Sequence, residues 1–311
     1  MVSHFAQGSM KKKLWVMMLS LTSIITFPLI ASSFEIQPLP IALKTRMIEV
    51  ETWKPSCPVE IDRLRLVQFT HYDFSGHQQQ GQMVVLEAVA ERVLNIFKAL
   101  HHYQFPIAQA KTMEEYLGQD KPSMAANNSS AFNYRPVAGK TFLSVHSYGV
   151  AIDINPIQNP CLEPKTIIDS EEVLIPVQPA EGQGYLNRTN VRAGMVEQVL
   201  EPIRGLRVVE LFKQNGFYVW GGKWNDPVDW QHFQPSRAAA EWLAFMSPED
   251  AKIMFEIYIS KPALLNDAAI RTFDFKTLYS RDPQRFMQAL HSPKFLEMSP
   301  QEAYNSLSEL M

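Results

Sequence analysis

The chain has 311 residues, of which 46% are hydrophobic and 20% are charged. At about 150 residues per domain this length fits one large domain or two small ones, and the composition excludes wholesale disorder, a collagen-like chain and a many-span membrane protein. The 29 basic and 32 acidic residues give a formal net charge of −3. Such a balance argues against a nucleic-acid-binding protein, which usually carries a basic stripe.

The first 33 residues have the layout of a secretory signal. Three lysines at positions 11 to 13 precede an uncharged run over residues 14–30, and the small residues Ala31, Ser32 and Ser33 follow. This order predicts a signal peptide over residues 1–33 with cleavage near Ser33, and hence a periplasmic or secreted protein. The alternative is an uncleaved membrane anchor, although the run is short for a span and contains polar residues. Cleavage removes three lysines and no acidic residue, changes the net charge from −3 to −6 and leaves no stable membrane span.

The two cysteines, Cys57 and Cys161, both stand next to prolines. In an oxidising compartment an isolated pair is most simply a disulfide, which we therefore expect here. Two free thiols and a metal-binding role are the alternatives.

The first half of the chain predicts a strand, a helix and connecting segments. Residues 34–60 contain four prolines and are predicted to be irregular. A strand is expected from Leu64, and it ends at the turn residues 73–76. After Gly81 a stripe of apolar residues at helical spacing predicts a helix; its members are Val85, Val89, Val93, Ile96, Phe97 and Leu100. Residues 120–130 are expected to form a loop.

The second half predicts a site-bearing region and a helical tail. Residues 141–156 are short and rich in β-formers, a helix is expected from about 191 to 214, and residues 217–220 are expected to form a strand. Beyond residue 240, a capping side chain precedes a proline at positions 247, 282 and 299, which predicts a series of short helices. We therefore predict one domain over residues 34–240 and a helical C-terminal extension over residues 241–311.

Asp153 is the first candidate for chemistry. It stands between Ile152 and Ile154 in an apolar context, and a buried carboxylate is costly unless it is paired or binds a metal. His146 precedes it by seven residues, and Gly149 between them permits a sharp reversal. Two imidazoles and one carboxylate form a zinc shell that leaves the fourth position open, as in catalytic sites.

A second segment carries Asp229 three residues before His232. On a turn or a bulged strand this spacing places a free carboxylate close to a metal without making it a ligand, which is what a general base requires. Arg135 is a candidate cation for the developing oxyanion or for a substrate carboxylate.

Each of these residues also has a purely structural interpretation. A histidine in an apolar run is more often a hydrogen-bonded core residue than a ligand, Asp229 could cap a turn after Pro227, and Arg135 could lie on the surface. The spacing alone leaves the metal site and the structural interpretation equally open.

The combined pattern resembles a known family. Ser144-x-His146-x6-Asp153, followed far downstream by Asp229-x-x-His232, is similar to the LAS zinc peptidases, which include D-alanyl-D-alanine carboxypeptidases and L-alanyl-D-glutamate endopeptidases. The context agrees, with residues 123–135 before the first ligand and Gly216-Phe217 and Trp220-Gly221-Gly222 before the second. The resemblance covers roughly residues 60–236.

The resemblance implies a fold, a cofactor and roles for the residues. The expected fold is α+β, with a small antiparallel sheet and flanking helices around a zinc cleft. The resemblance implies that His146, Asp153 and His232 bind Zn²⁺ and that Asp229 is the catalytic base. It also implies that Ser144 and Arg135 contact the substrate and that Arg135 stabilises the oxyanion. The implied substrate is a stem peptide of bacterial peptidoglycan. Dipeptidases and several carboxypeptidases of the family have Glu where this chain has Asp229, and Asp is more similar to the L-alanyl-D-glutamate branch.

Two alternatives remain at this point. The first is a non-catalytic cell-wall-binding protein that keeps the zinc cleft, against which the free carboxylate of Asp229 argues. The second is an envelope protein with structural zinc or with no metal, in which the histidines are core residues.

Overall fold

The computed structural model describes residues 1–2, 32–163, 166–168, 172–174, 176–202, 205–262 and 272–310. The predicted signal peptide over residues 1–33 falls almost entirely on residues 3–31, which lie outside the described part. Among the described helices, none combines the length and the apolar character that a membrane span requires.

The fold is α+β, as predicted, with several small sheets in place of one. The described strands are β1 (Phe34–Pro38), β2 (Leu64–Tyr72), β3 (Gln78–Leu86), β4 (Gln109–Ala110), β5 (Asn128–Ser129), β6 (Ile152–Asp153), β7 (Cys161–Leu162), β8 (Thr166–Ile168), β9 (Glu172–Leu174), β10 (Val177–Gln178), β11 (Val219–Trp220), β12 (Val228–Asp229) and β13 (His232–Gln234). Among the described strands, three sheets have three strands each, in the orders β1-β2-β3, β10-β7-β12 and β11-β13-β6.

Helices connect and cover these sheets. The described α-helices are α1 (Ile41–Glu49), α2 (Ala90–His102), α3 (Asp120–Ala125), α4 (Val208–Gln214), α5 (Arg237–Phe245), α6 (Pro248–Ser260), α8 (Phe275–Arg281), α9 (Pro283–Leu290), α10 (Pro293–Glu297) and α11 (Pro300–Leu310). The described 3-10 helices are η1 (Ile61–Arg63), η2 (Met113–Tyr116), η3 (Val145–Tyr148), η4 (Ala180–Tyr185) and η5 (Gly221–Lys223).

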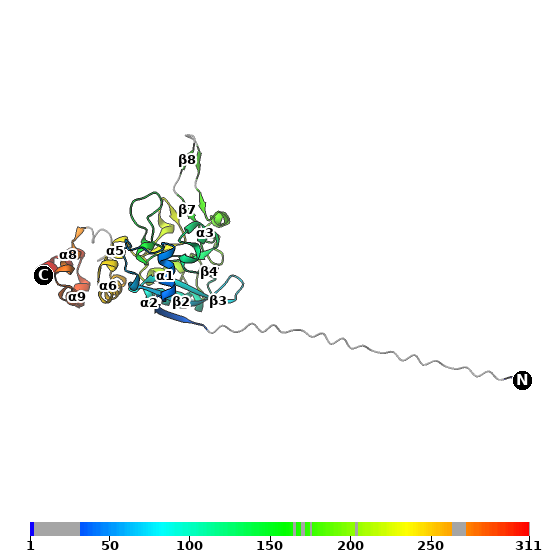
Figure 1. Ribbon diagram of the computed structural model, residues 1–311, viewed down its shortest axis with the longest axis horizontal. Coiled ribbons are helices and arrows are strands. Elements are labelled where there is room, and N and C mark those ends of the chain that lie inside the picture. The colour runs from blue at the N-terminus through cyan, green and yellow to red at the C-terminus, as the bar shows by residue number, and fades with distance from the viewer. Residues whose placement is uncertain are drawn as a thin grey trace. The chain divides into compact units, whose positions relative to one another are not determined.

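The longest described strands, β2 and β3, belong to the sheet β1-β2-β3, which we call the N-terminal sheet. Strands β2 and β3 pair antiparallel over nine residues each, and α2 packs against β2 (Figure 1). The predicted helix after Gly81 is therefore wrong in its first part, since residues up to Leu86 belong to β3 and α2 begins at Ala90. The reason is that Val84, Val85 and Leu86 are all buried, and Val85 matched the helical stripe by spacing alone.

Three further expectations need correction. Residues 34–60 are not irregular, because β1 pairs with β2 and α1 follows it. Residues 120–130 contain α3 and β5 as well as loop. The helix expected from about 191 to 214 is reduced to α4, which begins at Val208. Gly194 has a φ of +83°, and the described residues from there to α4 form turns, irregular segments and an isolated bridge between Val199 and Arg207.

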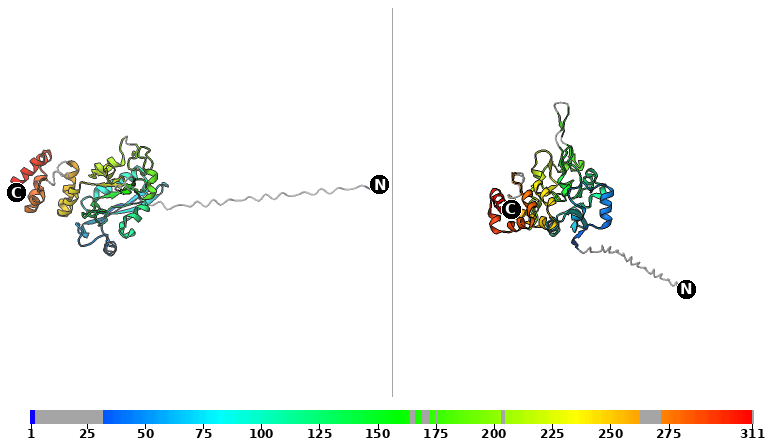
Figure 2. Two further views of the ribbon diagram at one scale, coloured as in Figure 1. Left: turned by 90° about the horizontal axis from the view of Figure 1, so that it is seen from above. Right: turned by 60° about the vertical axis from the view of Figure 1, so that its left-hand side comes forward.

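The C-terminal helices begin where the sequence predicts. Helices α6, α9 and α11 start at the three prolines, and the side chains of Ser247 and Asp282 cap the first two. The ring of Trp242 on α5 contacts the rings of Phe275 on α8 and Phe286 on α9. Aromatic packing therefore joins α5 to these two helices, which are coloured orange and red in Figure 2. Helix α5 crosses the predicted domain boundary at residue 240.

Cys57 and Cys161 are free thiols, so the expected disulfide is not formed. The Sγ atom of Cys57 donates to the carbonyl of Ser147 at 3.4 Å, whereas Cys161 pairs with Asp229 across β7 and β12. Burial raises the pKa of the Cys57 thiol to about 11. The two side chains thus belong to different environments, and each has its own neighbours.

Candidate metal centre

His146, Asp153 and His232 come together in the structure. Each offers one ligand atom, and the three atoms lie within 4.8 Å of one another. Nε2 of His146 is 3.2 Å from Nδ1 of His232 and 3.2 Å from a carboxylate oxygen of Asp153, and Nδ1 of His232 is 3.0 Å from the other oxygen. This group could hold a metal ion, as the sequence predicts.

The register of one sheet brings two of the three residues together. Strands β13 and β6 pair antiparallel with His232 directly opposite Asp153. Side chains at directly opposed positions project to the same face with their Cβ atoms roughly 5 Å apart. Two distant segments thereby place an imidazole and a carboxylate side by side.

His146 reaches the same point from a single turn of 3-10 helix. The hydroxyl of Ser144 accepts a hydrogen bond from the backbone N–H of His146 and caps η3. Gly149 ends η3 with a φ of +69°, and a Cβ atom there would lie 2.7 Å from the backbone nitrogen of Leu86. Only glycine fits this left-handed position against the N-terminal sheet, so the short turn and its glycine fix where the ring points.

The outer nitrogen of each imidazole has an acceptor. Nδ1 of His146 donates to the carbonyl of Ala131 at 2.5 Å, and Nε2 of His232 donates to the amide oxygen of Gln234 at 2.7 Å. Since a carbonyl only accepts, Nδ1 of His146 carries a hydrogen, and its Nε2 faces the group, where it can bind a cation or carry a second proton. Such outer contacts orient metal-ligating histidines in proteins.

The inner atoms require a positive charge. Nε2 of His146, Nδ1 of His232 and the carboxylate of Asp153 converge, and all three can accept, so protons or a cation must lie among them. Burial disfavours ionisation of Asp153, but its contacts with His146 and His232 outweigh burial and hold its pKa well below the usual range. For His232, burial lowers the pKa, and the hydrogen bond and charge of Asp153 outweigh it. Two imidazole nitrogens and one carboxylate oxygen form a donor set that suits Zn²⁺.

Asp229 lies near this group, on β12, and is not one of the three converging residues. Its Oδ1 atom is buried and has no hydrogen-bond partner among the described residues. Burial and the nearby charge of Asp153 raise the pKa of Asp229 to about 6. Gly221 permits this packing, because a Cβ atom there would lie 2.4 Å from the backbone carbonyl of Asp229. A buried carboxylate with a raised pKa and a free lone pair has the properties of a general base.

Residues 138–235, roughly a third of the chain, match a family model described as D-alanyl-D-alanine carboxypeptidase. The family resemblance is confirmed for this segment. It contains Ser144, the three converging residues and Asp229, whereas Arg135 lies just before it. No curated protein and no solved structure matches the chain at a significant level. The match supports the prediction that the protein is a peptidase.

The predicted substrate residues are both close in sequence to His146 but differ in their contacts. The buried hydroxyl of Ser144 is the cap of η3. The Nε atom of Arg135 lies 2.5 Å from a carboxylate oxygen of Asp120 on α3. The backbone of Arg135 is fixed to the turn of His146, since its N–H donates to Ser147 and its carbonyl accepts from the N–H of Ser144. Their substrate roles stay predictions.

The outer partners were not predicted from the sequence. Gln234 is two residues after His232 on the same strand, and side chains at positions i and i+2 lie on one face. Alternation along the strand could therefore have identified it. The carbonyl of Ala131 carried no signal, because any residue supplies a carbonyl.

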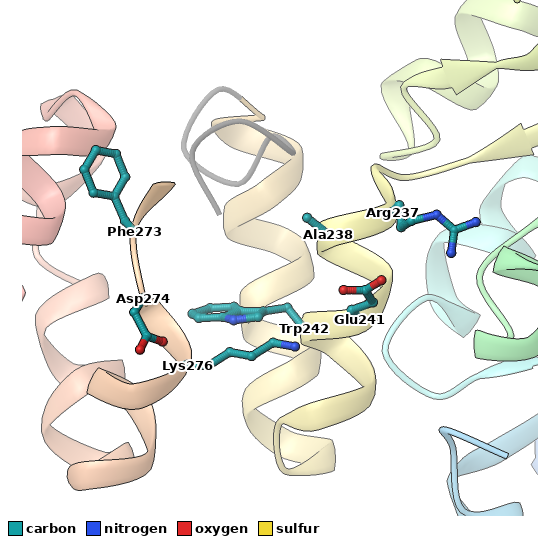
Figure 3. Close-up of a pocket in the computed structure, with 7 residues that line it drawn as sticks. All are labelled: Arg237, Ala238, Glu241, Trp242, Phe273, Asp274 and Lys276. Atoms are coloured by element: carbon teal, nitrogen blue, oxygen red, sulfur yellow. The ribbon is translucent and has the colours of Figure 1, made fainter. Parts of the chain in front are cut away.

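A cavity lies elsewhere, away from these residues. It has a volume of about 200 Å³ and lies between α5 and the start of α8 (Figure 3). Its lining residues are Arg237, Ala238, Glu241, Trp242, Phe273, Asp274 and Lys276. None of the converging residues contributes to it, so this cavity carries none of the argument for the metal centre.

Proposed function

We propose that the protein is a zinc peptidase that hydrolyses peptide bonds in the stem peptides of bacterial peptidoglycan, and that it acts in the periplasm or outside the cell. The observation that carries the proposal is the convergence of His146, Asp153 and His232, with the carboxylate of Asp229 close by. The family match over residues 138–235 supports the reaction class and the kind of substrate.

The three converging side chains would hold Zn²⁺ through Nε2 of His146, Nδ1 of His232 and a carboxylate oxygen of Asp153. When bound, the ion supplies a Lewis acid that polarises the scissile carbonyl and acidifies water. The outer contacts to Ala131 and Gln234 keep both rings in the required tautomer.

Asp229 supplies the proton transfers. Its carboxylate takes a proton from the attacking water and returns it to the amine that leaves. Oδ1 has no hydrogen-bond partner in the described part of the chain, so a lone pair is available for the proton. Arg135 lies next to the turn of His146, where its guanidinium would stabilise the oxyanion or bind a substrate carboxylate.

Two bonds are candidates for cleavage. The description of the matching family points to the D-alanyl-D-alanine bond at the end of the stem peptide. The aspartate at position 229 favours the L-alanyl-D-glutamate bond near its start. The masses of the fragments distinguish the two, because the first cut releases a single alanine and the second releases most of the stem.

The test is digestion of purified peptidoglycan by the purified mature chain loaded with zinc, with mass spectrometry of the muropeptides. We expect new fragments with the wild type, and none after chelation or with Asp229→Asn. An Asp229→Asn protein that releases fragments at the wild-type rate would refute the assignment of the base. A zinc-loaded wild type that binds peptidoglycan and releases no fragment would instead establish the non-catalytic binding protein.

A further inference from the structure

The candidate base and the candidate ligands lie on different sheets. Asp229 is on β12 in the sheet β10-β7-β12, whereas His232 and Asp153 are on β13 and β6 in the sheet β11-β13-β6. Only Trp230 and Gln231 connect the two strands. The position of the base relative to the ligands therefore depends on this two-residue junction.

Backbone contacts hold the junction from several sides. The N–H of Trp230 donates to the carbonyl of Pro160 at 3.4 Å, and the carbonyl of Trp230 accepts from the indole of Trp220 at 2.9 Å. The carbonyl of Gln231 accepts from the N–H of Ile154 at 3.1 Å. These contacts fix the path of the backbone. The indole ring of Trp230 has a further contact of its own.

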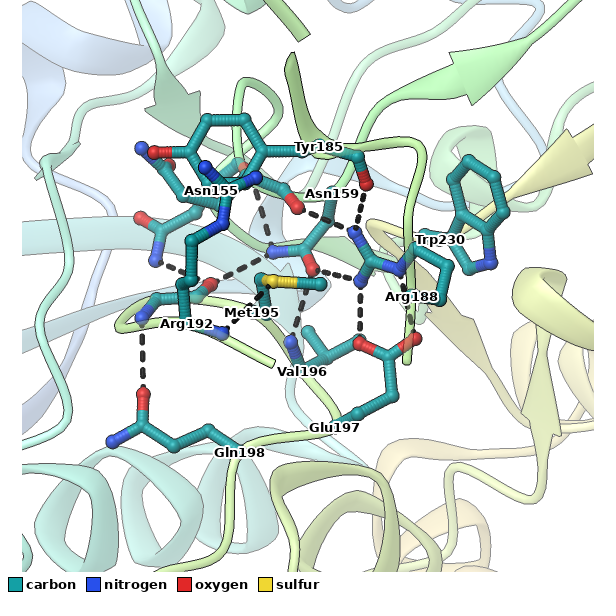
Figure 4. A network of polar contacts seen from close by, with 12 residues as sticks. Asn155, Asn159, Tyr185, Arg188, Arg192, Met195, Val196, Glu197, Gln198 and Trp230 are labelled. Atoms are coloured by element: carbon teal, nitrogen blue, oxygen red, sulfur yellow. Dashed lines mark hydrogen bonds and ion pairs between the residues drawn. The ribbon is translucent and has the colours of Figure 1, made fainter. Parts of the chain in front are cut away.

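The guanidinium of Arg188 lies over the ring of Trp230, with Cζ 4.8 Å from the ring centroid. Figure 4 shows the guanidinium between Trp230, Asn159 and Glu197. Both carboxylate oxygens of Glu197 accept from Arg188, one of them at 2.9 Å from Nε. Its remaining bonds go to Oδ1 of Asn159 at 2.9 Å and to the carbonyls of Gln158 and Tyr185 at 2.7 and 3.2 Å.

The ion pair is largely buried, since the Arg188 and Glu197 side chains are 14% and 12% exposed. Five contacts to acceptors in fixed positions leave the guanidinium plane one orientation. A planar cation held in this way stacks on an aromatic ring, which a lysine ammonium does not reproduce. The pair is thus built to present a rigid flat surface to Trp230.

Asn159 connects the same network to the strand of Asp153. Its Nδ2 donates to the carbonyls of Ile154 at 3.0 Å and Gly194 at 2.9 Å, and its Oδ1 accepts from the N–H of Val196 at 2.9 Å (Figure 4). The segment that follows Asp153 is therefore held by the hydrogen bonds of this network, and the ring of Trp230 is held by its cation–π contact with Arg188 in the same network. The Arg188 guanidinium is the member that touches both.

We propose that Arg188 is a positioning residue that sets the distance between the carboxylate of Asp229 and the converging side chains of His146, Asp153 and His232. This inference rests on the proposed function and adds to it a residue that touches no substrate. It acts through Trp230, because a shift of that ring moves β12 against β13. A misplacement of about 1 Å in a reacting group can reduce turnover about 100-fold.

The test uses the full mature chain loaded with zinc and replaces the ion pair without leaving a buried charge, in the double variant Arg188→Met/Glu197→Met. The matched control is Arg46→Met/Glu49→Met, which removes an exposed pair on α1. Three quantities are measured: kcat and KM for stem-peptide cleavage, the zinc content, and amide hydrogen exchange of peptides that contain residues 228–232.

We expect the double variant to lose 10- to 100-fold in kcat, with KM within twofold and one zinc per chain, and to exchange faster within residues 228–232 alone. Arg188→Lys keeps the charge and loses the planar stack, so its kcat should lie between that of the wild type and that of the double variant. The control should match the wild type in all three measurements.

An unchanged kcat in the double variant would overturn the inference, and so would a loss of zinc and faster exchange across the whole chain, which indicate a merely structural role. If the wild type cleaves no stem peptide, the proposed function fails. Exchange then decides this inference by itself: faster exchange confined to residues 228–232 supports it, and unchanged exchange overturns it.

Discussion

The candidate site has a ligand side, formed by His146, Asp153 and His232, and a base side, formed by Asp229. The two sides differ in whether their polar atoms have hydrogen-bond partners. On the ligand side, each imidazole has an acceptor for its outer nitrogen, and Asp153 contacts both rings. On the base side, Oδ1 of Asp229 is buried with no partner among the described residues. The atoms of the ligand side are thus oriented by their neighbours, whereas the base side leaves a lone pair unpaired at a cost in stability, as the proposed proton transfer requires.

The largest expected effect comes from the ligand side. His232→Ala removes one of three ligands and leaves Asp153 without its cross-strand partner, so we expect no bound zinc and no peptidase activity. Elemental analysis of the purified variant measures this, with His102→Ala on the exposed face of α2 as the control. Stoichiometric zinc in His232→Ala would show that the three side chains do not form the metal centre.

The base side should separate binding from turnover. Asp229→Asn keeps the shape of the side chain and removes its basicity, so we expect kcat to fall by about 10²- to 10⁴-fold with zinc still bound. Kinetics on a stem peptide and zinc content of the same preparation give both numbers. Asp226→Asn, on the exposed turn three residues earlier, is the control and should retain full activity.

The outer contacts should matter less than the ligands themselves. Gln234→Leu leaves the Nε2–H of His232 without its acceptor, so zinc affinity should fall about 10- to 100-fold. Competition with a chelator of known affinity measures the change. Gln234→Glu keeps an acceptor and should bind zinc close to the wild-type level, and equal affinity in all three proteins would mean that the ring is oriented by packing alone.

The smallest expected effect is a gain in stability. Because the pKa of Asp229 is raised to about 6, this group favours the fold below its unfolded pKa and loses that contribution as the pH rises through the folded value. Asn has no charge to bury, so metal-free Asp229→Asn should be more stable than the wild type by about 3 kcal/mol at pH 8, the free-energy equivalent of the raised pKa. The difference should vanish near pH 4.

Denaturant unfolding of both metal-free proteins at the two pH values checks this expectation. A variant that is less stable than the wild type at pH 8 would mean that the carboxylate of Asp229 finds a stabilising partner in solution. Asp229 would then have a partner as the residues of the ligand side do, and the contrast between the two sides would be wrong.

The candidate site residues and the starts of the tail helices could be named from local patterns. The Ser144-x-His146 and Asp229-x-x-His232 motifs lie in the matched segment, and α6 and α9 begin at a capped proline because such a cap acts within one turn. The strands of the site could not be located, since β6, β7, β11 and β12 have two residues each. Two residues are too few to show any alternation of apolar and polar side chains.

The order and identity of the candidate ligands and the base are written in the chain, because they depend on residue type and on spacing over a few positions. Their meeting is a property of the tertiary structure. The register of β6 and β13 sets His232 opposite Asp153, Gly149 fits η3 against the N-terminal sheet, and Arg188 stacks on Trp230 from a segment about 40 residues away. Such contacts join distant segments through hydrogen bonds and close packing, and those arise only when the whole chain has folded.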